Sequence, residues 1–283
     1  MRFASGSWEL YAETFGDATD PPVVLLHGAG NSMMAWDAEL CEQLAGRGRL
    51  VVRLDSRDAG RSVRPDGAGP YSLHDLAGDV VALLDALELP AATLAGVSPG
   101  GMTAPIVAVE HPARVSGLVL ISTTLGDDGL PGPVEGLFAD GPEPPDWADR
   151  AAAVRYLVEL ERPYGAARFD EELHTRIAER SFDHAGDIAG QLTYPFEGEG
   201  GPLGRDRLGE IQVPAVVVHG TADPMFPVEH GRALAAAIHG ARLVEVDGFG
   251  HATLPRDEWP LLVELISSLP APPPPAGATP PPA

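Results

Sequence analysis

The sequence predicts an α/β protein with a mostly parallel sheet, helices on both faces of that sheet and a helical insertion. One observation is that short, uninterrupted apolar runs alternate with segments whose apolar residues recur at helical spacing. Uninterrupted apolar runs are typical of strands that are buried on both faces, as in parallel sheets. A second observation is the length of 283 residues with 44% hydrophobic content, which suffices for one large α/β domain with an insertion.

Strands and helices alternate in the N-terminal half. Residues 8–15 predict an early strand, and the apolar run 23–26 predicts a buried one. A helix is expected at 37–45, and the next apolar strand at 50–54. Residues 73–87 carry apolar side chains at helical spacing and therefore predict a helix.

The alternation continues and, after a long gap, resumes near the C-terminus. A short strand at 91–95 precedes a helix over 102–110, and a further strand is expected at 115–121. The C-terminal part supplies two more strands and two more helices. The strands are predicted at 215–218 and 242–246, and the helices at 232–238 and 259–269.

The segment of about residues 125–208 has a different character. It is rich in Pro and Gly over 129–145, then helical in pattern, without a convincing strand. Its helices are expected at 151–160, 171–181 and 188–192. An insertion placed after a sheet strand is most simply a helical lid over the carboxyl ends of the strands, where α/β sheets keep their sites. Most of its aromatic side chains are expected to form the lid's own small core.

These patterns divide the chain into a core in two parts, a lid and a tail. The core is expected at residues 1–124 and 209–269, with the lid at 125–208 between them. Residues 270–283 are mostly Pro and Ala and have nothing to bury, so this tail is expected to be disordered.

The charge and the amino-acid composition argue against some classes of binding partner. The formal net charge of −22 argues against a nucleic-acid partner and against an anionic membrane surface, since both need basic patches. The only cysteine, Cys41, excludes an intrachain disulfide and is expected to fill a small apolar space. Residues 1–7 lack the apolar stretch of a signal peptide, and no later run is long enough to span a membrane. We expect a cytoplasmic enzyme with a small hydrophobic substrate and with no cofactor and no metal, and no pattern sets its oligomeric state.

The motif Gly-Val-Ser-Pro-Gly-Gly at 96–101 lies between the strand 91–95 and the helix 102–110. This is the G-x-S-x-G pattern of a nucleophile elbow in its required context of strand, sharp turn and helix. Ser98 is therefore the candidate nucleophile. In a chain with 33 glycines the same letters also fit an ordinary glycine turn, so the partners of Ser98 decide between the two readings.

A serine hydroxyl needs a base within hydrogen-bond reach and a carboxylate that orients the base. His251 follows the last predicted strand and Asp223 follows the strand before it, so both lie at carboxyl ends of strands, like Ser98. We expect His251 to be the base and Asp223 the acid. Asp127 is the alternative acid, whereas Asp247 is too near His251 in sequence to reach across the sheet easily. Structural or solvated roles are expected for His74, His111, His174, His184, His230 and His239.

The loop His-Gly-Ala-Gly at 27–30 directly follows the buried strand 23–26. A backbone N–H at this position is expected to stabilise the oxyanion of an acyl-transfer reaction. Ala29 is the expected donor, with Gly30 second. The residue after the nucleophile normally gives the other donor, and here it is Pro99, which has no N–H. The oxyanion position at residue 99 is thus occupied without a donor.

With these motifs in place, the chain resembles the α/β-hydrolase superfamily over roughly residues 8–269. Within it, the chain looks most like the aclacinomycin methylesterase group and its relatives in bacterial aromatic polyketide pathways. Besides the elbow, the resemblance rests on the segments 54–62, 182–186 and 248–252 and on the Asp-Pro pair at 223–224. It implies the Ser-His-Asp triad named above and an apolar substrate pocket under the lid. The proline after the nucleophile departs from the family pattern.

The resemblance also suggests roles for other residues. Arg57 and Asp58 are expected to form a buried or half-buried ion pair that holds their loop. The residues expected to line the substrate pocket are His27, Gly28, Trp147, Tyr156, Phe182 and Tyr194.

Three functions fit this pattern. The first is a serine esterase that cleaves a carboxylic ester, expected to be a methyl ester of a hydrophobic, polyketide-like molecule. The second is non-hydrolytic chemistry, a cyclisation, elimination or rearrangement in which the His251–Asp223 pair acts as general base; Pro99 favours it. The third is a ligand receptor built on a hydrolase scaffold, and the complete triad argues against it because a receptor needs no proton relay.

Overall fold

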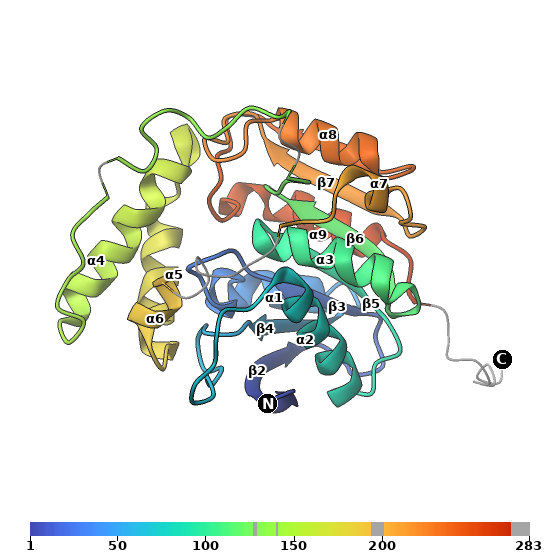
Figure 1. Cartoon of the computed structure of the whole chain (residues 1–283), viewed down its shortest axis with the longest axis horizontal. Helices are drawn as coiled ribbons and strands as arrows, with labels where there is room; N and C mark the ends of the chain where they lie inside the picture. Colours follow the sequence, from blue (N-terminus) through green and yellow to red (C-terminus); the bar gives the residue numbers. More distant parts are fainter. Residues whose placement is uncertain (127–128, 140, 194–200, 273–283) are drawn as a thin grey trace.

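An eight-stranded sheet forms the centre of the structure, with the strand order β1-β2-β4-β3-β5-β6-β7-β8 (Figure 1). The computed structural model describes residues 1–126, 129–139, 141–193 and 201–272. The strands are β1 Arg2–Ser5, β2 Trp8–Phe15, β3 Pro22–Leu26, β4 Leu50–Asp55, β5 Ala92–Val97, β6 Val115–Ile121, β7 Ala215–Gly220 and β8 Arg242–Val246. The helices are α1 Ala38–Ala45, α2 Leu73–Ala86, α3 Pro99–Glu110, α4 Arg150–Glu161, α5 Glu171–His184, α6 Ile188–Thr193, α7 Arg205–Leu208, α8 Glu229–Ala237 and α9 Trp259–Ser268.

The predicted mostly parallel sheet is confirmed. Strands β4, β3, β5, β6, β7 and β8 pair in parallel, while β2 pairs antiparallel with both β1 and β4. Strand β1 is not predicted by the sequence pattern, because it is short and has an exposed face. Helix α3 begins at Pro99 and not at the expected residue 102, since a proline's fixed φ and missing N–H suit the first helical position.

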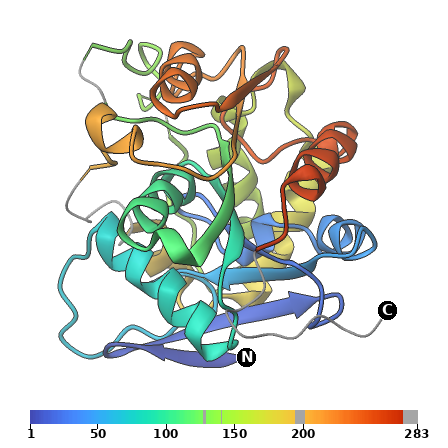
Figure 2. The same ribbon diagram turned by 90° about the vertical axis from the view of Figure 1, so that its right-hand side faces the viewer.

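The strand residues alternate between two hydrophobic cores, one on each face of the sheet. Val24 and Leu26 of β3 pack with α2, α3 and α8, and Val23 and Leu25 pack with α1 and α9. Figure 2 shows α2 and α3 on one side of the sheet and α1 and α9 on the other. Cys41 of α1 is wholly buried in the second core, and this burial raises the pKa of its thiol to about 12. The cysteine therefore acts as a small apolar filler.

The helices α4, α5 and α6 of the segment predicted to be a lid, called the lid below, lie together beside the sheet, on the left of Figure 1. They have a small core of their own, formed by Val154, Leu157, Val158, Ala178 and Ile188, against which Trp147, Phe169 and Phe182 pack. Tyr194, expected to line the substrate pocket, and Asp127, the alternative acid, lie outside the described part of the chain. The tail expected to be disordered falls outside it from residue 273 onward.

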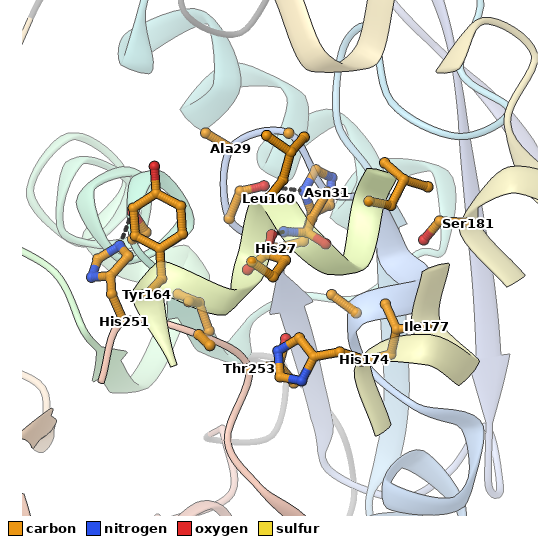
Figure 3. Close-up of a pocket in the computed structure, with 18 of the residues that line it drawn as sticks. His27, Ala29, Asn31, Leu160, Tyr164, His174, Ile177, Ser181, His251 and Thr253 are labelled. Carbon is orange, nitrogen blue, oxygen red and sulfur yellow. Dashed lines mark hydrogen bonds between the residues drawn. The ribbon is translucent and has the colours of Figure 1, made fainter. Parts of the chain in front are cut away.

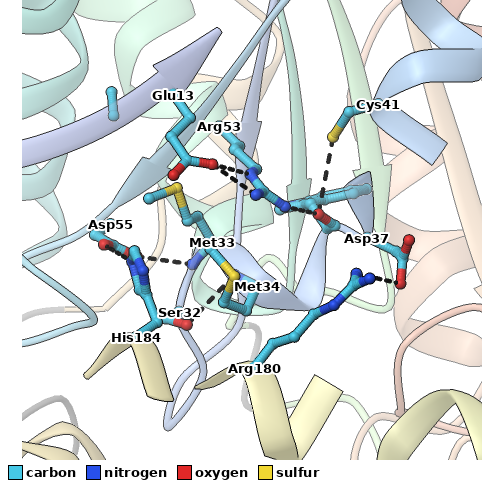
Figure 4. A network of polar contacts seen from close by, with 12 residues as sticks. Glu13, Ser32, Met33, Met34, Asp37, Cys41, Arg53, Asp55, Arg180 and His184 are labelled. Carbon is cyan, nitrogen blue, oxygen red and sulfur yellow. Dashed lines mark hydrogen bonds and ion pairs between the residues drawn. The ribbon is translucent and has the colours of Figure 1, made fainter. Parts of the chain in front are cut away.

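The end of α5 ties the lid to the core. His184 lies 2.6 Å from a carboxylate oxygen of Asp55, at the end of β4, and the backbone N–H of Gly186 donates to the carbonyl of Gly60 at 2.7 Å. One turn earlier, Arg180 donates to Asp37 at 3.1 Å (Figure 4). The lid segment 182–186 is thus an anchoring segment, which places α5 over the ends of the strands.

Candidate active site

The turn between β5 and α3 holds Ser98 in a strained backbone conformation, with φ 52° and ψ −119°. The strand and the helix cross here so closely that side chains would not fit. A Cβ atom on Gly96 would lie 2.3 Å from the carbonyl carbon of Gly100, and a Cβ on Gly100 would lie 2.6 Å from the oxygen of Leu26. The backbone of Ser98 is held on both sides, by a bond from its N–H to Ile121 and by the Thr123 hydroxyl on its carbonyl. The glycines therefore permit the turn that presents the serine hydroxyl.

The structure brings Ser98, His251 and Asp223 together in a hydrogen-bonded chain. Nε2 of His251 lies 3.1 Å from the Ser98 hydroxyl oxygen, and its Nδ1 lies 2.8 Å from Oδ2 of Asp223. The other carboxylate oxygen of Asp223 accepts the backbone N–H groups of Met225 at 2.9 Å and Phe226 at 2.8 Å. Because the carboxylate is buried and fixed by these bonds, it holds the imidazole with Nε2 toward the serine.

The lid also holds the histidine. The backbone N–H of His251 donates to the carbonyl of Tyr164 at 2.6 Å, a residue of the lid. This approach requires Gly250, because a Cβ there would lie 2.0 Å from the same carbonyl oxygen. The ring of Phe226 packs edge-on against the imidazole, with 5.1 Å between ring centroids. The position of His251 therefore depends on lid and core together.

A second buried histidine, His219, lies behind the acid and was not singled out in the sequence analysis. Its Nε2 donates to the carbonyl of Phe226 at 2.7 Å and lies 3.5 Å from Oδ2 of Asp223. Burial lowers the pKa of His219, which favours the neutral ring. The sequence signal for its burial is that His219 directly follows the apolar run 215–218 of strand β7.

The loop after β3 is braced by its own histidine. His27 is buried, its Nδ1 donates to the carbonyl of Gly28 at 2.8 Å, and its Nε2 accepts the backbone N–H of Ser56 at 3.2 Å. Burial lowers the pKa of His27. Both ring nitrogens of neutral His27 are thus hydrogen-bonded, and these two bonds hold the loop after β3 against the end of β4. Ala29 and Gly30 line the same cavity as Ser98.

Two lid side chains contact this loop. Gln191 of α6 is buried and bridges two core loops: its Oε1 accepts the N–H of Gly60 at 2.9 Å, and its Nε2 donates to the carbonyl of Gly30 at 3.1 Å. Asn31, the next residue of the loop, donates to Glu161 of α4 at 3.1 Å. No sequence motif marks Gln191 as a site residue. The lid segment therefore contacts both the loop that is expected to supply the oxyanion donor and His251, the expected base.

A cavity of about 310 Å³ lies between the lid and these residues, within the usual range for small-molecule sites (Figure 3). Of the residues expected to line it, His27, Gly28 and Tyr156 do so. Trp147 and Phe182 do not; they pack in the lid's own core, where Trp147 meets Tyr156 edge-on. The lining is largely apolar and includes Leu40, Val97, Leu157, Leu160, Ile177, Leu254 and Leu262.

The expected ion pair between Arg57 and Asp58 does not form. Arg57 instead pairs with Asp79 of α2 at 2.8 Å, and Asp58 pairs with Arg64. Asp58 has a positive φ of 61°, and this turn separates its side chain from that of its neighbour. Both pairs are partly or wholly buried and hold the loop, so the structural role stands with different partners.

Among the described residues there is no cluster of three or more His, Cys, Asp or Glu side chains that could hold a metal ion. Within the same residues, no helix is long and apolar enough to cross a membrane.

The family profile and the similar proteins agree on the family to which the chain is related. The sequence profile of the family described as alpha/beta hydrolase fold matches residues 21–256. The rhodomycin D methylesterase DauP of Streptomyces sp. (strain C5) is 32% identical over 270 residues, which cover 86% of this chain and 89% of DauP. The rhodomycin D methylesterase DnrP of Streptomyces peucetius is 30% identical over 271 residues, with the same coverage.

Solved structures agree at the level of the fold. The enol-lactonase from Burkholderia xenovorans LB400 superimposes with a TM-score of 0.73 at 26% identity, covering 94% of this chain and 98% of that one. Together the comparisons confirm the predicted fold class and the resemblance to the methylesterase group.

Proposed function

The chain belongs to the α/β-hydrolase family, and we propose that it is a serine hydrolase that cleaves a carboxylic ester through Ser98, His251 and Asp223. The observation that carries the proposal is the hydrogen-bonded chain from Asp223 through His251 to Ser98, at a cavity with a largely apolar lining. A nucleophile, a base and an orienting carboxylate in this order are what acyl transfer requires.

The mechanism follows from the hydrogen bonds. The oxygen of Ser98 attacks the ester carbonyl carbon while Nε2 of His251 takes the hydroxyl proton, and the Asp223 carboxylate stabilises the resulting imidazolium. His251 then gives its proton to the departing alkoxide, which leaves as an alcohol, and the acyl group stays on Ser98. Water attacks this acyl-enzyme with His251 again as base. The carboxylic acid is released and the serine hydroxyl is restored.

The proposed substrate is a methyl ester of a hydrophobic, polyketide-like molecule. Two similar proteins are named methylesterases, each about nine-tenths covered by the match. A cavity with a largely apolar lining suits a molecule whose ester group is carried on a hydrophobic body. The cytoplasmic location and the tail expected to be disordered stay predictions from the sequence.

The oxyanion that develops on the ester carbonyl has fewer N–H donors available than in a usual serine hydrolase, because residue 99 is a proline. We propose that the loop after β3 supplies its donor, with Ala29 first and Gly30 second, because both line the cavity beside Ser98. Pro99 offers no N–H at the position of the second donor. Loss of one such donor typically costs about 10²–10³ in kcat, so a slow esterase is expected.

Pro99 also favours a second candidate function. An enzyme that needs no oxyanion hole can use the His251–Asp223 pair as a general base for a cyclisation, elimination or rearrangement. In that case the Ser98 hydroxyl would not be acylated. A non-catalytic ligand receptor fits less well, since it would not need the bond between His251 and Ser98.

A panel of aryl and polyketide methyl esters, assayed with the wild type and with Ser98→Ala side by side, tests the proposal. Hydrolysis by the wild type that is lost in Ser98→Ala supports the acyl-enzyme. Near-wild-type turnover by a folded Ser98→Ala variant would instead support the general-base function.

A further inference from the structure

A single carboxylate lines the cavity beside Ser98. Glu161, the last residue of α4, is the only Asp, Glu, Lys or Arg in the lining formed by the residues that the structure describes. The rest of that lining is largely apolar, with histidines and neutral polar side chains between the apolar ones. The ionised carboxylate therefore gives this cavity a negative charge.

A hydrogen bond holds Glu161 in this place. Its Oε1 accepts from the side-chain amide of Asn31 at 3.1 Å, and Asn31 lines the same cavity. The amide is neutral, so it fixes the carboxylate without cancelling its charge. The neighbouring Arg162 pairs with Glu159 and Glu171, and within the described ranges no Arg or His side chain forms an ion pair with Glu161.

The charge of Glu161 acts close to the triad. Burial raises the pKa of Tyr164, and the negative charge of Glu161 raises it further. The carbonyl of this tyrosine accepts the backbone N–H of His251, and its ring centroid lies 6.4 Å from that of the imidazole. Figure 3 draws Tyr164 beside His251 and includes Asn31 in the lining. Glu161 thus belongs to the part of the lining that borders the triad.

Ester cleavage changes the charge of the molecule in this cavity. The ester group is neutral, whereas the released acid is a carboxylate at neutral pH. Like charges repel each other more strongly beside an apolar wall than in water. We propose that Glu161 is a specificity-determining residue that disfavours anionic acyl groups, so that the neutral ester is admitted and the carboxylate product binds weakly.

The proposal rests on the proposed function in one respect, namely that the anion is the acid released by cleavage at Ser98. It adds that the product inhibits the enzyme weakly. It also adds that an ester with a free carboxylate close to its reacting carbonyl is a poor substrate. Glu161 acts here through its charge and needs no contact with the reacting atoms.

Two probes of matched shape, 2-naphthoate and 2-naphthamide, separate charge from fit. Calorimetry with the Ser98→Ala protein at neutral pH measures both affinities without any chemical step. In this background Glu161→Gln removes the charge, and its amide oxygen can still accept from Asn31. We expect the affinity for naphthoate, relative to that for naphthamide, to rise about five- to tenfold in Glu161→Gln. A ratio that Glu161→Gln leaves unchanged would overturn the proposal.

Glu179→Gln is the matched control. It removes the same charge from an exposed side chain of the lid helix α5 that does not line the cavity. The ratio of the two affinities should then change by less than about twofold, because an exposed and distant charge is screened. An equal rise in Glu161→Gln and Glu179→Gln would show that the net charge of the chain discriminates between the probes, which would contradict a specific role of Glu161. Glu161→Ala is a second charge-free variant and should raise the ratio in the same direction.

Failure of the proposed function gives a different result. If the wild type hydrolyses no ester but Glu161→Gln raises the ratio as expected, the charge discrimination stands and the esterase function fails. If the wild type hydrolyses methyl 2-naphthoate but the ratio is the same with and without the charge of Glu161, the esterase function stands and the charge discrimination fails.

Discussion

The side-chain amide of Gln191 donates a hydrogen bond to the backbone carbonyl of Gly30, 3.1 Å away. Gln191 belongs to the lid, and Gly30 belongs to the loop that follows β3 beside Ser98. The same amide accepts the N–H of Gly60, so it is fixed at both ends. Because Pro99 offers no N–H, the loop after β3 carries more of the expected oxyanion stabilisation, and its position is set in part by the lid.

Gln191→Leu should lower esterase kcat about tenfold, with a smaller change in KM, because the loop proposed to hold the oxyanion donor loses a hydrogen bond that positions it. It should also destabilise the fold by about 1–3 kcal/mol, since the Gly60 N–H is left buried without a partner. Steady-state kinetics and thermal unfolding check both effects. Gln212→Leu removes an exposed amide and serves as the control. Unchanged kcat in Gln191→Leu would contradict the role of the lid.

Asp223→Asn should reduce kcat by about 10⁴-fold at neutral pH, by analogy with other Ser-His-Asp sites. The amide can keep the shape of the carboxylate but cannot stabilise the imidazolium, and it favours the wrong tautomer of His251. Asp247→Asn, in the loop before the histidine, is the control and should be nearly silent. A silent Asp223→Asn together with an inactive Asp127→Asn would show that Asp127 is the acid.

The free energy of unfolding should fall as the pH drops below about 6.5, the ordinary pKa of histidine. Burial lowers the pKa of His27 and His219 in the folded state, so below that pH the unfolded chain binds protons that the folded chain refuses. The stability from these groups is present above pH 6.5 and is lost as the pH falls toward their folded pKa values. Each can contribute a slope of up to about 1.4 kcal/mol per pH unit.

Urea unfolding from pH 8 to pH 5 measures this dependence. His27→Gln, whose amide can also donate and accept, should be less stable at pH 8 but should show a shallower slope toward acid. His111→Gln alters an exposed histidine and should leave the slope unchanged. A His27→Gln slope equal to that of the wild type would rule out His27 as a source of the acid sensitivity.

Pro99→Ala restores a backbone N–H at the start of α3 and should raise kcat on an activated ester by about 10–100-fold. The gain should appear in kcat, because the restored donor strengthens as charge develops on the carbonyl oxygen. Pro105→Ala restores an N–H within the same helix, at a residue that does not line the cavity, and should leave kcat unchanged. If Pro99→Ala does not raise kcat, another group already fills the oxyanion hole.

Periodicity and motif spacing predict the framework well. The inner strands β3 to β7 are buried on both faces and so consist largely of apolar residues, and the elbow is specified by glycines whose Cβ atoms would clash. The chain order of Ser98, Asp223 and His251 follows from where strands end in a parallel sheet. These features depend on residues close together in the sequence, and they can therefore be predicted from a single sequence.

Contacts between segments that are distant in sequence are harder to predict from periodicity and motif spacing. The aromatic residues Trp147 and Phe182 suggest a pocket by type, yet Trp147, in the turn before α4, and Phe182, on α5, both pack against the lid's core, and Tyr156 faces the cavity. Arg57 and Asp58 are adjacent in sequence, but a positive φ sends them to different partners. Gln191 contacts loops more than a hundred residues away, and no periodicity marks such a residue.

The central claim is that Ser98 is acylated during ester cleavage. The most direct measurement is peptide mass spectrometry of the protein quenched in acid during turnover of p-nitrophenyl butyrate. We expect a butyryl group on the peptide that contains Ser98, and no such group in Ser98→Ala, which should release nitrophenol only at the background rate. Nitrophenol release by the wild type with the butyryl group on another residue, or undiminished release by Ser98→Ala, would contradict it.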